Sequence, residues 1–477
     1  MTIGDIKKGE SSHLEFKREV PERKENFLKT VSAFSNTSGG KIVFGVDDKS
    51  LELLGIDGDI FKIQDSIINC ISDSIEPLIS PNINAQTIED KTVIVLEIFP
   101  TNHTPCFIKS KGKENGTFLR IGATSRLADF YTLRELELNG IRSSFDSQKC
   151  VNLMNDKKHF NSQITKNLCQ QIQKRMEKAG AQNITVTEET LEGLGVLKRI
   201  NGELFPTNAY ALLTLSDSYD FSRCSVRCAC FKGRDKAIFL DKLDCSGAIF
   251  EQVEQALNFV LRNLKVGIKF VGVQGIDDFE LPVNALREAI VNAVVHRNYM
   301  IEEPTQIAIY DDRVEIISPG RLVSGLSLES ALNGKSIARN PIIAKVFRLM
   351  KLMEEWGSGF RRIYQECEKA NVKPPKFQEN ELDCSIVFER VEKQNGGING
   401  GINGGINGGI NLSKNENLVF EAIKNNPSQT NSELVKSLKL SSRTIDRCIK
   451  SLRDNNLISR EGSNKTGFWK IVDGEKK

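Results

Sequence analysis

The spacing of apolar residues over the first 145 positions predicts helices that alternate with strands. Phe27, Val31 and Phe34 recur at helical spacing. A turn signal at Gly39-Gly40 follows them, and the apolar run after it is typical of a buried strand. The expected elements are helices over 22–36 and 60–75 and strands over 41–46 and 92–99. Together they predict a compact α/β domain.

The pattern continues into further folded regions. Leu281-Pro282 opens a new pattern, and proline suits the first turn of a helix. Upstream of it we expect helices near 161–179, 186–200 and 248–264 and a strand over 224–231. The predicted fold class is α/β (α+β) and multidomain, divided into 1–145, a connecting region 146–280, 281–392, a linker 393–412 and 413–477.

One low-complexity segment interrupts the chain. The tetrad Gly-Gly-Ile-Asn occurs four times between Gly396 and Asn411. Because glycine loses the most backbone entropy on ordering, and few isoleucines offer burial, the segment predicts a flexible linker. The alternative is that the Ile-Asn pairs form short strands that associate between subunits.

Composition excludes several classes of protein. The 39% hydrophobic and 27% charged fractions are ordinary for soluble globular proteins and exclude a collagen, a disordered polyelectrolyte and a membrane bundle. The sequence has no run of about 18 apolar residues, and its first residues lack the apolar core of a signal peptide. We therefore expect a cytoplasmic protein without a membrane partner.

The eleven cysteines show no framework spacing, which predicts reduced thiols. The closest group lies on a strand-like segment and does not have the paired spacing of a zinc site, so buried thiols are expected. Its members are Cys224, Cys228, Cys230 and Cys245.

The net charge of the whole chain says little about its partners, whereas the distribution of charge along the chain says more. The 65 basic and 62 acidic residues give a net charge of +3. From Leu412 to the end, 13 Lys and Arg against 8 Asp and Glu give +5, which leaves −2 for the rest. Affinity for nucleic acid must therefore come from local patches.

Carboxylates come together near the N-terminus. Glu15 lies in an alternating, strand-like segment, and Glu10 can meet it across a turn. The strand over 41–46 places Asp47 and Asp48 at its carboxyl end, where α/β sheets usually carry their sites. Three such carboxylates can hold Mg²⁺ or Mn²⁺ and activate water for attack on a phosphodiester. The alternative is a set of solvated surface acids.

Three segments in this region carry a family resemblance: GESSHLEFKRE, VSAFSNTSGGKIVFGVDDKS and GTFLRIGATSRLAD. In this order, across nearly all of 1–135, they resemble the AlbA-like domain of the Schlafen superfamily. The resemblance implies nucleic-acid binding, and some members cleave RNA with two Glu and one Asp. The Glu pair falls on Glu10 and Glu15, and the Asp falls on Asp47 or Asp48.

A basic stretch broken only by Glu114 follows in the same domain. We expect it to form a hairpin that tracks a phosphate backbone, and an ordinary solvated face is the alternative. Its members are Lys109, Lys111, Lys113, Arg120 and Arg126.

The segment 283–295 predicts a helix with an apolar face and an unusual polar stripe. Glu288, Asn292 and His296 are each four residues apart, so they share one face. Asn can ligate Mg²⁺, and Glu can orient a water towards a phosphate. The alternative is a helix that faces a groove without a ligand.

This helix and two later segments resemble the GHKL-type ATPase module of RecG-like proteins and transcriptional regulators: LPVNALREAIVNAVVHRNY, VEIISPGRL and ARNPIIAKVFRLMKLMEEWGSGFRRI. The resemblance spans about 281–365 and implies an α/β sandwich that binds ATP. Its first box falls on Glu288 and Asn292. Its glycine-rich boxes fall near Gly320 and on Gly357 and Gly359, where backbone N–H groups can approach phosphates.

The sequence departs from this module at one position. ATPases of this type bind the adenine amino group with an Asp just before the first glycine box, but the segment 316–320 contains no carboxylate. The nearest acids, Asp311, Asp312 and Glu315, belong to the preceding turn and strand. The departure indicates nucleotide binding that is weakened, altered in base preference or lost.

The C-terminal segment resembles a winged helix-turn-helix. Helices are expected over 415–425, 431–438 and 442–455, with a capping box from Thr430 to Glu433 and a two-stranded wing after them. The third helix would enter a major groove, and protein contact is the alternative use of this fold. The expected contacts are Arg443 and Arg447 to bases and Lys450, Lys465 and Lys470 to phosphates.

Together these features predict a DNA-binding transcriptional regulator with an ATP-binding module. DNA, RNA and further copies of the chain in a homo-oligomer are the expected partners. The first alternative is a metal-dependent Schlafen-type nuclease that acts on RNA, tRNA or single-stranded DNA in phage defence. The second is an oligomeric scaffold without catalysis.

Overall fold

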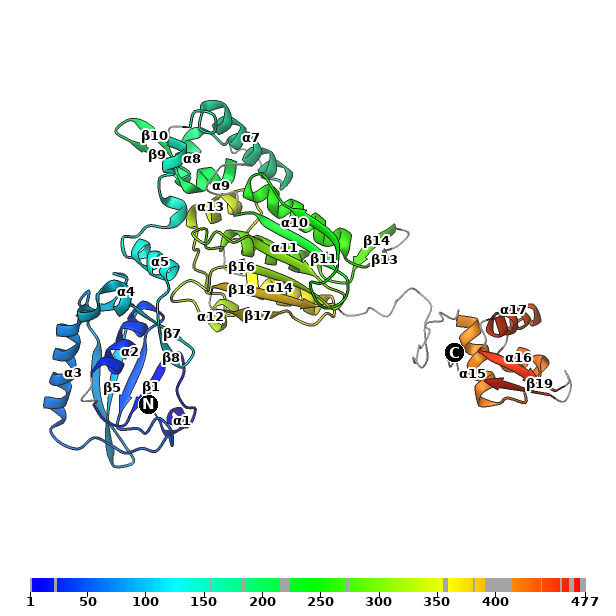
Figure 1. Cartoon of the computed structure of the whole chain (residues 1–477), viewed down its shortest axis with the longest axis horizontal. Coiled ribbons are helices and arrows are strands. Elements are labelled where there is room, and N and C mark those ends of the chain that lie inside the picture. Colours follow the sequence, from blue (N-terminus) through cyan, green and yellow to red (C-terminus); the bar gives the residue numbers. More distant parts are fainter. Residues whose placement is uncertain are drawn as a thin grey trace. The chain divides into compact units, whose positions relative to one another are not determined.

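Figure 1 shows the chain as a computed structural model. Two compact units form, Met1–Val266 with Asp278–Glu392, and Gly267–Asp277 with Lys393–Lys477. The predicted linker 393–412, Gly357 and Lys465 lie outside the described residues. The structure describes residues 2–20, 24–154, 156–181, 185–214, 224–271, 274–354, 359–380, 382–390, 414–438, 440–454, 457–462 and 467–471.

A four-stranded sheet of order β1-β2-β5-β4 organises the N-terminal region. β1 is parallel to β2, and β5 and β4 are antiparallel to their neighbours. Phe27, Val31 and Phe34 of α2 share one core with the sheet, as their spacing predicts. The elements are α1 (Ile3–Ile6), β1 (Leu14–Lys17), α2 (Glu25–Asn36), β2 (Gly40–Phe44), α3 (Ile60–Ser74), β3 (Ile75–Glu76), β4 (Asn82–Ile88), β5 (Lys91–Ile98) and β6 (Phe107–Ile108).

The basic stretch that follows is not one hairpin, contrary to the prediction. Lys109–Lys111 and Gly112–Gly116 form the short helical turns η1 and α4. The Thr117 hydroxyl donates to the Lys113 carbonyl at 2.7 Å, which closes α4 before the next strand begins. The hairpin consists only of β7 (Phe118–Ile121) and β8 (Thr124–Leu127), and α5 (Phe130–Gly140) follows it.

The middle of the chain and the segment after it build one six-stranded sheet, of order β12-β11-β15-β16-β18-β17. β11 pairs in parallel with β15, although the predicted boundary at 280 separates them. The apolar core likewise runs without a break from Cys150 to Phe388. The regions 146–280 and 281–392 are therefore one folded body, because β11 satisfies its backbone hydrogen bonds on a strand from the other region.

One predicted helix in this body is shorter than expected. Gly195 adopts a φ of +86° and ends α8 (Glu188–Leu194), so β9 (Leu197–Ile200) replaces the rest of the predicted helix 186–200. The remaining elements before the polar helix are η2 (Phe145–Ser147), α6 (Val151–Met154), α7 (Ser162–Lys178), β10 (Glu203–Pro206), α9 (Asn208–Thr214), β11 (Val226–Phe231), β12 (Phe239–Asp244), α10 (Ile249–Asn263), β13 (Val266–Val271) and β14 (Gln274–Phe279).

The polar helix has the bounds that the sequence predicts, α11 (Val283–Val295). In Figure 1 it lies over the six-stranded sheet next to α10. The elements after it are β15 (Thr305–Ile309), β16 (Arg313–Pro319), α12 (Leu328–Leu332), α13 (Pro341–Leu349), α14 (Gly359–Lys369), β17 (Lys376–Glu379) and β18 (Asp383–Glu389).

The C-terminal residues form three helices followed by a two-stranded antiparallel sheet. Val419, Leu434, Ile449 and Trp469 belong to their common core. The capping box is present, since the Thr430 N–H donates to Glu433 Oε2 at 2.8 Å and the Glu433 N–H donates to the Thr430 hydroxyl at 3.4 Å. The elements are α15 (Lys414–Asn425), α16 (Asn431–Leu438), α17 (Ser442–Asp454), β19 (Ile458–Glu461) and β20 (Phe468–Ile471).

All eleven cysteines are free thiols, as predicted, and every one except Cys384 is buried. Cys228 and Cys245 approach most closely, with 3.9 Å between their sulfur atoms. Over the ranges that the structure describes, no helix is long and apolar enough to cross a membrane.

Candidate functional site

One cavity brings together the polar stripe of α11 and glycines from two loops. The sequence nominated all five of these positions from three separate segments. The cavity is lined by Glu288 and Asn292 of α11, His296 directly after that helix, Gly320 after β16 and Gly359 at the start of α14. We call it the α11 cavity.

Glu288 and Asn292 form a hydrogen-bonded pair on its wall. Asn292 Nδ2 donates to Glu288 Oε1 at 3.3 Å. The bond engages the amide nitrogen, so the amide oxygen is the atom that Asn292 offers to a cation. Burial raises the pKa of Glu288, which makes its carboxylate a stronger base than an exposed one.

The two glycines bring backbone unusually close to other groups. A Cβ on Gly359 would lie 2.6 Å from Glu288 Oε1 and 2.9 Å from Asn292 Nδ2. Gly320 has a φ of +102°, and a Cβ there would lie 2.8 Å from Arg339 Nη1. Only glycine fits these positions without displacing the neighbouring side chains.

His296 completes the stripe with an uncharged imidazole. Burial and the nearby Arg339 and Arg348 lower its pKa to about 4. At pH 7 the ring is therefore neutral, and it adds no positive charge to the cavity.

We expect His296 to make the protein less stable in mild acid. An unfolded imidazole takes up its proton near pH 6.5, whereas the folded one does so only near pH 4. The contribution of the neutral ring to the free energy of unfolding is at its maximum above pH 6.5. It falls by about 3 kcal/mol as the pH drops to 4. Denaturant unfolding of wild type and His296→Gln at pH 7, 5.5 and 4 measures the effect. The difference in free energy of unfolding between wild type and His296→Gln should change by that amount between pH 7 and pH 4. A difference that does not depend on pH would contradict the lowered pKa of His296.

Ser318, Lys335 and Arg339 also line this cavity, and sequence reasoning gave them no role. The Ser318 hydroxyl donates to the Ala293 carbonyl at 2.7 Å, just before the glycine box where the sequence lacks a carboxylate. Arg339 Nη1 donates to the His296 carbonyl at 2.7 Å. For Lys335 and Arg339 the sequence did carry a usable signal. Both lie in the polar segment just before Pro341, a proline that starts a helix.

The N-terminal carboxylates do not form the metal site that the sequence suggested. Within the described part of the chain, no group of three or more His, Cys, Asp or Glu side chains could hold a metal ion. Glu15 Oε2 accepts from Arg120 at 2.5 Å, and Glu15 Oε1 accepts from Lys17 at 2.5 Å. Two cations thus neutralise the central carboxylate, so the residues present do not fit a three-carboxylate metal site.

The other acids of this set also have protein partners or lie apart. Glu10 Oε1 accepts from the Phe16 N–H at 2.8 Å, and burial raises its pKa. Asp47 Oδ1 accepts from the Ser50 N–H at 2.7 Å, and hydrogen bonds from Ser50 lower its pKa. Asp48 is exposed. Asp47 therefore stabilises its own turn.

Arg120 is not the surface phosphate contact that the sequence suggested. Its side chain is only 1% exposed and also donates to the Ser11 carbonyl at 3.0 Å. The rest of the basic set is nearer to solvent and partly paired: Lys109 donates to the Ser72 carbonyl, Lys111 pairs with Glu25 at 2.6 Å, Lys113 lies 3.7 Å from Glu137, and Arg126 is exposed on β8.

A compact basic stripe lies instead on α17. Arg443, Arg447 and Lys450 are exposed, while Ile445 and Cys448 between them are buried. Lys470 is exposed on β20 and pairs with Glu461 at 3.1 Å. The stripe therefore faces away from the core of its unit.

Two segments of the chain match known sequence families. Residues 10–129 match the family described as "Schlafen, AlbA_2", and residues 302–388 match "Putative ATP-dependent DNA helicase recG C-terminal". These matches confirm the Schlafen AlbA-like and RecG-like resemblances drawn from the sequence. The second match begins after α11, so it does not include Glu288 and Asn292.

Individual relatives are similar over parts of their length. The Uncharacterized ATP-binding protein UU034 of Ureaplasma parvum is 38% identical over 88 residues, which are 18% of this chain and 23% of that relative. The chain thus spans less than a quarter of this curated relative. The DIP2311 protein of Corynebacterium diphtheriae has a TM-score of 0.42 at 20% identity, covering 97% of this chain and 92% of that one. The N-terminal domain of a RecG-related protein of Nitrosomonas europaea has a TM-score of 0.21 at 21% identity, covering 27% and 90%.

Proposed function

We propose that this chain is a nucleic-acid-binding regulator that binds ATP in the α11 cavity. The observation that carries the ATP part is the convergence of Glu288, Asn292, Gly320 and Gly359 on one cavity. The match of residues 302–388 to the RecG-type C-terminal family and the similarity to an ATP-binding protein support it.

The cavity residues have distinct roles in this proposal. Gly320 and Gly359 let phosphates approach the backbone. Mg²⁺, when it arrives with the nucleotide, neutralises phosphate charge, and Asn292 offers it one amide oxygen beside the phosphate oxygens. ATPases of this type bind the adenine amino group with an Asp just before the first glycine box. This chain has Ser318 there, whose hydroxyl is a neutral acceptor, so we expect the cavity to select adenine less strongly.

The nucleic-acid part rests on two regions. Residues 10–129 match the Schlafen AlbA_2 family, which supports an N-terminal nucleic-acid surface. On α17, three exposed cations one helical turn apart have the charge and spacing to enter a major groove. We therefore propose duplex DNA as the partner of α17 and transcriptional regulation as the outcome of binding.

Arg447→Ala should weaken binding of the full chain to duplex DNA at least about fivefold, because it removes a cation from the centre of the stripe. Fluorescence anisotropy with a labelled duplex at two salt concentrations measures the change. Lys424→Ala is the matched control, since Lys424 is a half-exposed cation on another helix of the same region. If the two variants bound the duplex with equal affinity, α17 would not be the helix that contacts the DNA bases.

A further inference from the structure

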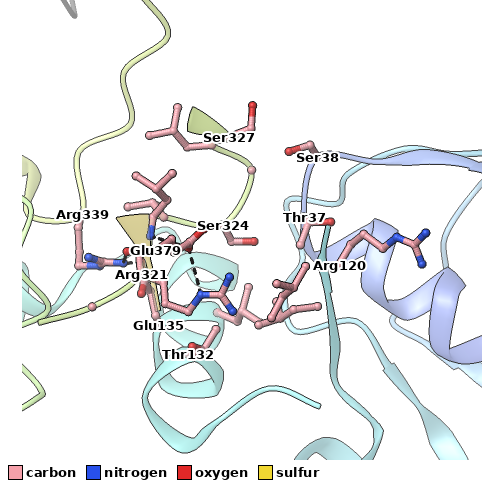
Figure 2. Close-up of a pocket in the computed structure, with 18 of the residues that line it drawn as sticks. Thr37, Ser38, Arg120, Thr132, Glu135, Arg321, Ser324, Ser327, Arg339 and Glu379 are labelled. Carbon is pink, nitrogen blue, oxygen red and sulfur yellow. Dashed lines mark hydrogen bonds and ion pairs between the residues drawn. The ribbon is translucent and has the colours of Figure 1, made fainter. Parts of the chain in front are cut away.

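A single loop separates the α11 cavity from a second cavity in the same unit. The second cavity, shown in Figure 2, lies against the N-terminal region and is lined by Thr37, Ser38 and Arg120 among others. Six residues line both cavities: Gly320, Arg321, Leu322, Val323, Leu326 and Arg339. The loop 320–327 therefore supplies a wall that the two cavities share.

On the N-terminal side, the loop holds the turn that ends α2. The Ser324 hydroxyl donates to the Asn36 carbonyl, and Figure 2 shows Ser324 on the side that faces Thr37. Asn36 is itself anchored, because its side chain donates to the Cys106 carbonyl at 2.7 Å and accepts from the Cys106 N–H at 2.7 Å. The turn is thus anchored within its own region by hydrogen bonds that do not involve the loop.

On the α11 side, the loop is held by an exposed lysine. Lys335 Nζ donates to the Gly325 carbonyl at 2.8 Å, next to Ser324. Lys335 also lines the α11 cavity. A hydrogen bond from an ammonium to a charged phosphate oxygen is roughly twice as strong as one to a neutral carbonyl. A phosphate in the cavity would therefore draw Lys335 away from Gly325.

Arg339 holds the base of the loop in place. It forms an ion pair with Glu135 of α5 at 3.1 Å and donates to the carbonyls of His296 and Arg321. Its side chain is only 6% exposed, so its position is fixed by these acceptors. Because Arg339 holds the base of loop 320–327, we expect any displacement of this loop at its far end, where Gly325 has a φ of +84°.

We propose that Lys335 binds the phosphates of the nucleotide and that its departure from Gly325 releases loop 320–327 from the turn after α2. This inference rests on the proposed ATP binding and extends it. Nucleotide occupancy would thereby change the contact between the ATP-binding body and the AlbA-type region. By linkage, any change that weakens the loop–turn contact beforehand should strengthen nucleotide binding.

Ser324→Ala provides the test, because Ser324 contacts the turn and does not line the α11 cavity. A bound nucleotide no longer has to break that hydrogen bond, so the variant should bind ATP about fivefold more tightly than wild type. Titration calorimetry of the full chain with Mg-ATP measures the affinities. Ser50→Ala is the matched control, since the Ser50 hydroxyl also makes a side-chain hydrogen bond, to Asp47 at 3.0 Å, but lies outside loop 320–327 and lines neither cavity, so the affinity should stay unchanged.

Lys335→Met gives a second measurement. Loss of the ammonium should weaken ATP binding about tenfold, whereas Lys62→Met, at an exposed lysine of α3, should not. If wild type binds ATP and Ser324→Ala binds it equally or more weakly, the release mechanism is overturned and the proposed function stands. If wild type binds no ATP, the proposed ATP function itself fails, and the release mechanism fails with it.

Discussion

Replacement of Glu15 by alanine should lower the free energy of unfolding of the N-terminal region by about 3–5 kcal/mol. Glu15 is the charged partner of Arg120, whose side chain is only 1% exposed. Removal of the carboxylate leaves a buried guanidinium without its ion-pair partner. Carbonyls of Ser11 and Leu14 still accept from Arg120, but they supply no negative charge.

Denaturant unfolding of the full chain, followed by circular dichroism, measures this loss. Asp48→Ala is the matched control, because Asp48 is an exposed acid of the same region and should change stability by no more than about 0.5 kcal/mol. Glu15→Ala combined with Arg120→Met should recover part of the loss, since no buried charge remains. A Glu15→Ala protein as stable as Asp48→Ala would contradict the buried pair.

This result would also change how activity data are interpreted. Glu15 is the residue that a nuclease hypothesis would mutate first. A loss of nucleic-acid cleavage or binding in Glu15→Ala would then report on unfolding of the domain, unless the stability of the variant were measured beside it.

If the α11 cavity binds ATP as proposed, Gly359→Ala should abolish the stabilisation that we expect from Mg-ATP. A nucleotide at 100 times its Kd stabilises the folded state by about 2.7 kcal/mol, which appears as a rise in Tm. The added methyl group would lie 2.6 Å from Glu288 Oε1 and 2.9 Å from Asn292 Nδ2. It must displace the pair that forms the wall of the α11 cavity, so the rise in Tm should disappear.

Gly193→Ala is the matched control, because Gly193 lies within α8 and a Cβ there would meet nothing within 4 Å. It should keep the full rise in Tm and gain slightly in stability from the better helix former. Asn292→Ala tests the same site without adding bulk and should also lose the rise. An undiminished rise in both cavity variants would place ATP binding elsewhere.

The sequence was sufficient where a feature depends on local backbone geometry. A repeat of four residues predicts that Glu288, Asn292 and His296 lie on one side, and all three line one cavity, with His296 directly after the end of α11. Thr430 and Glu433 likewise form the predicted capping box, since both groups belong to one helical turn. Gly320 and Gly359 were singled out by the resemblance to GHKL-type ATPases, and in the structure both bring backbone close to other groups.

Only the tertiary structure decided which charges meet. Arg120 was expected on a basic surface and Glu15 in a metal site, yet they neutralise each other across 105 positions of sequence. The roles that we propose for Lys335 and Ser324 likewise depend on one loop lying between two cavities. Periodicity reports the backbone geometry and the buried face of a segment, whereas ion pairs depend on which segments the fold brings together. That is why the sequence by itself located α2, α3, α7, α10, α11 and the three C-terminal helices with a minority of the strands, whereas the fold alone decided which N-terminal charges pair.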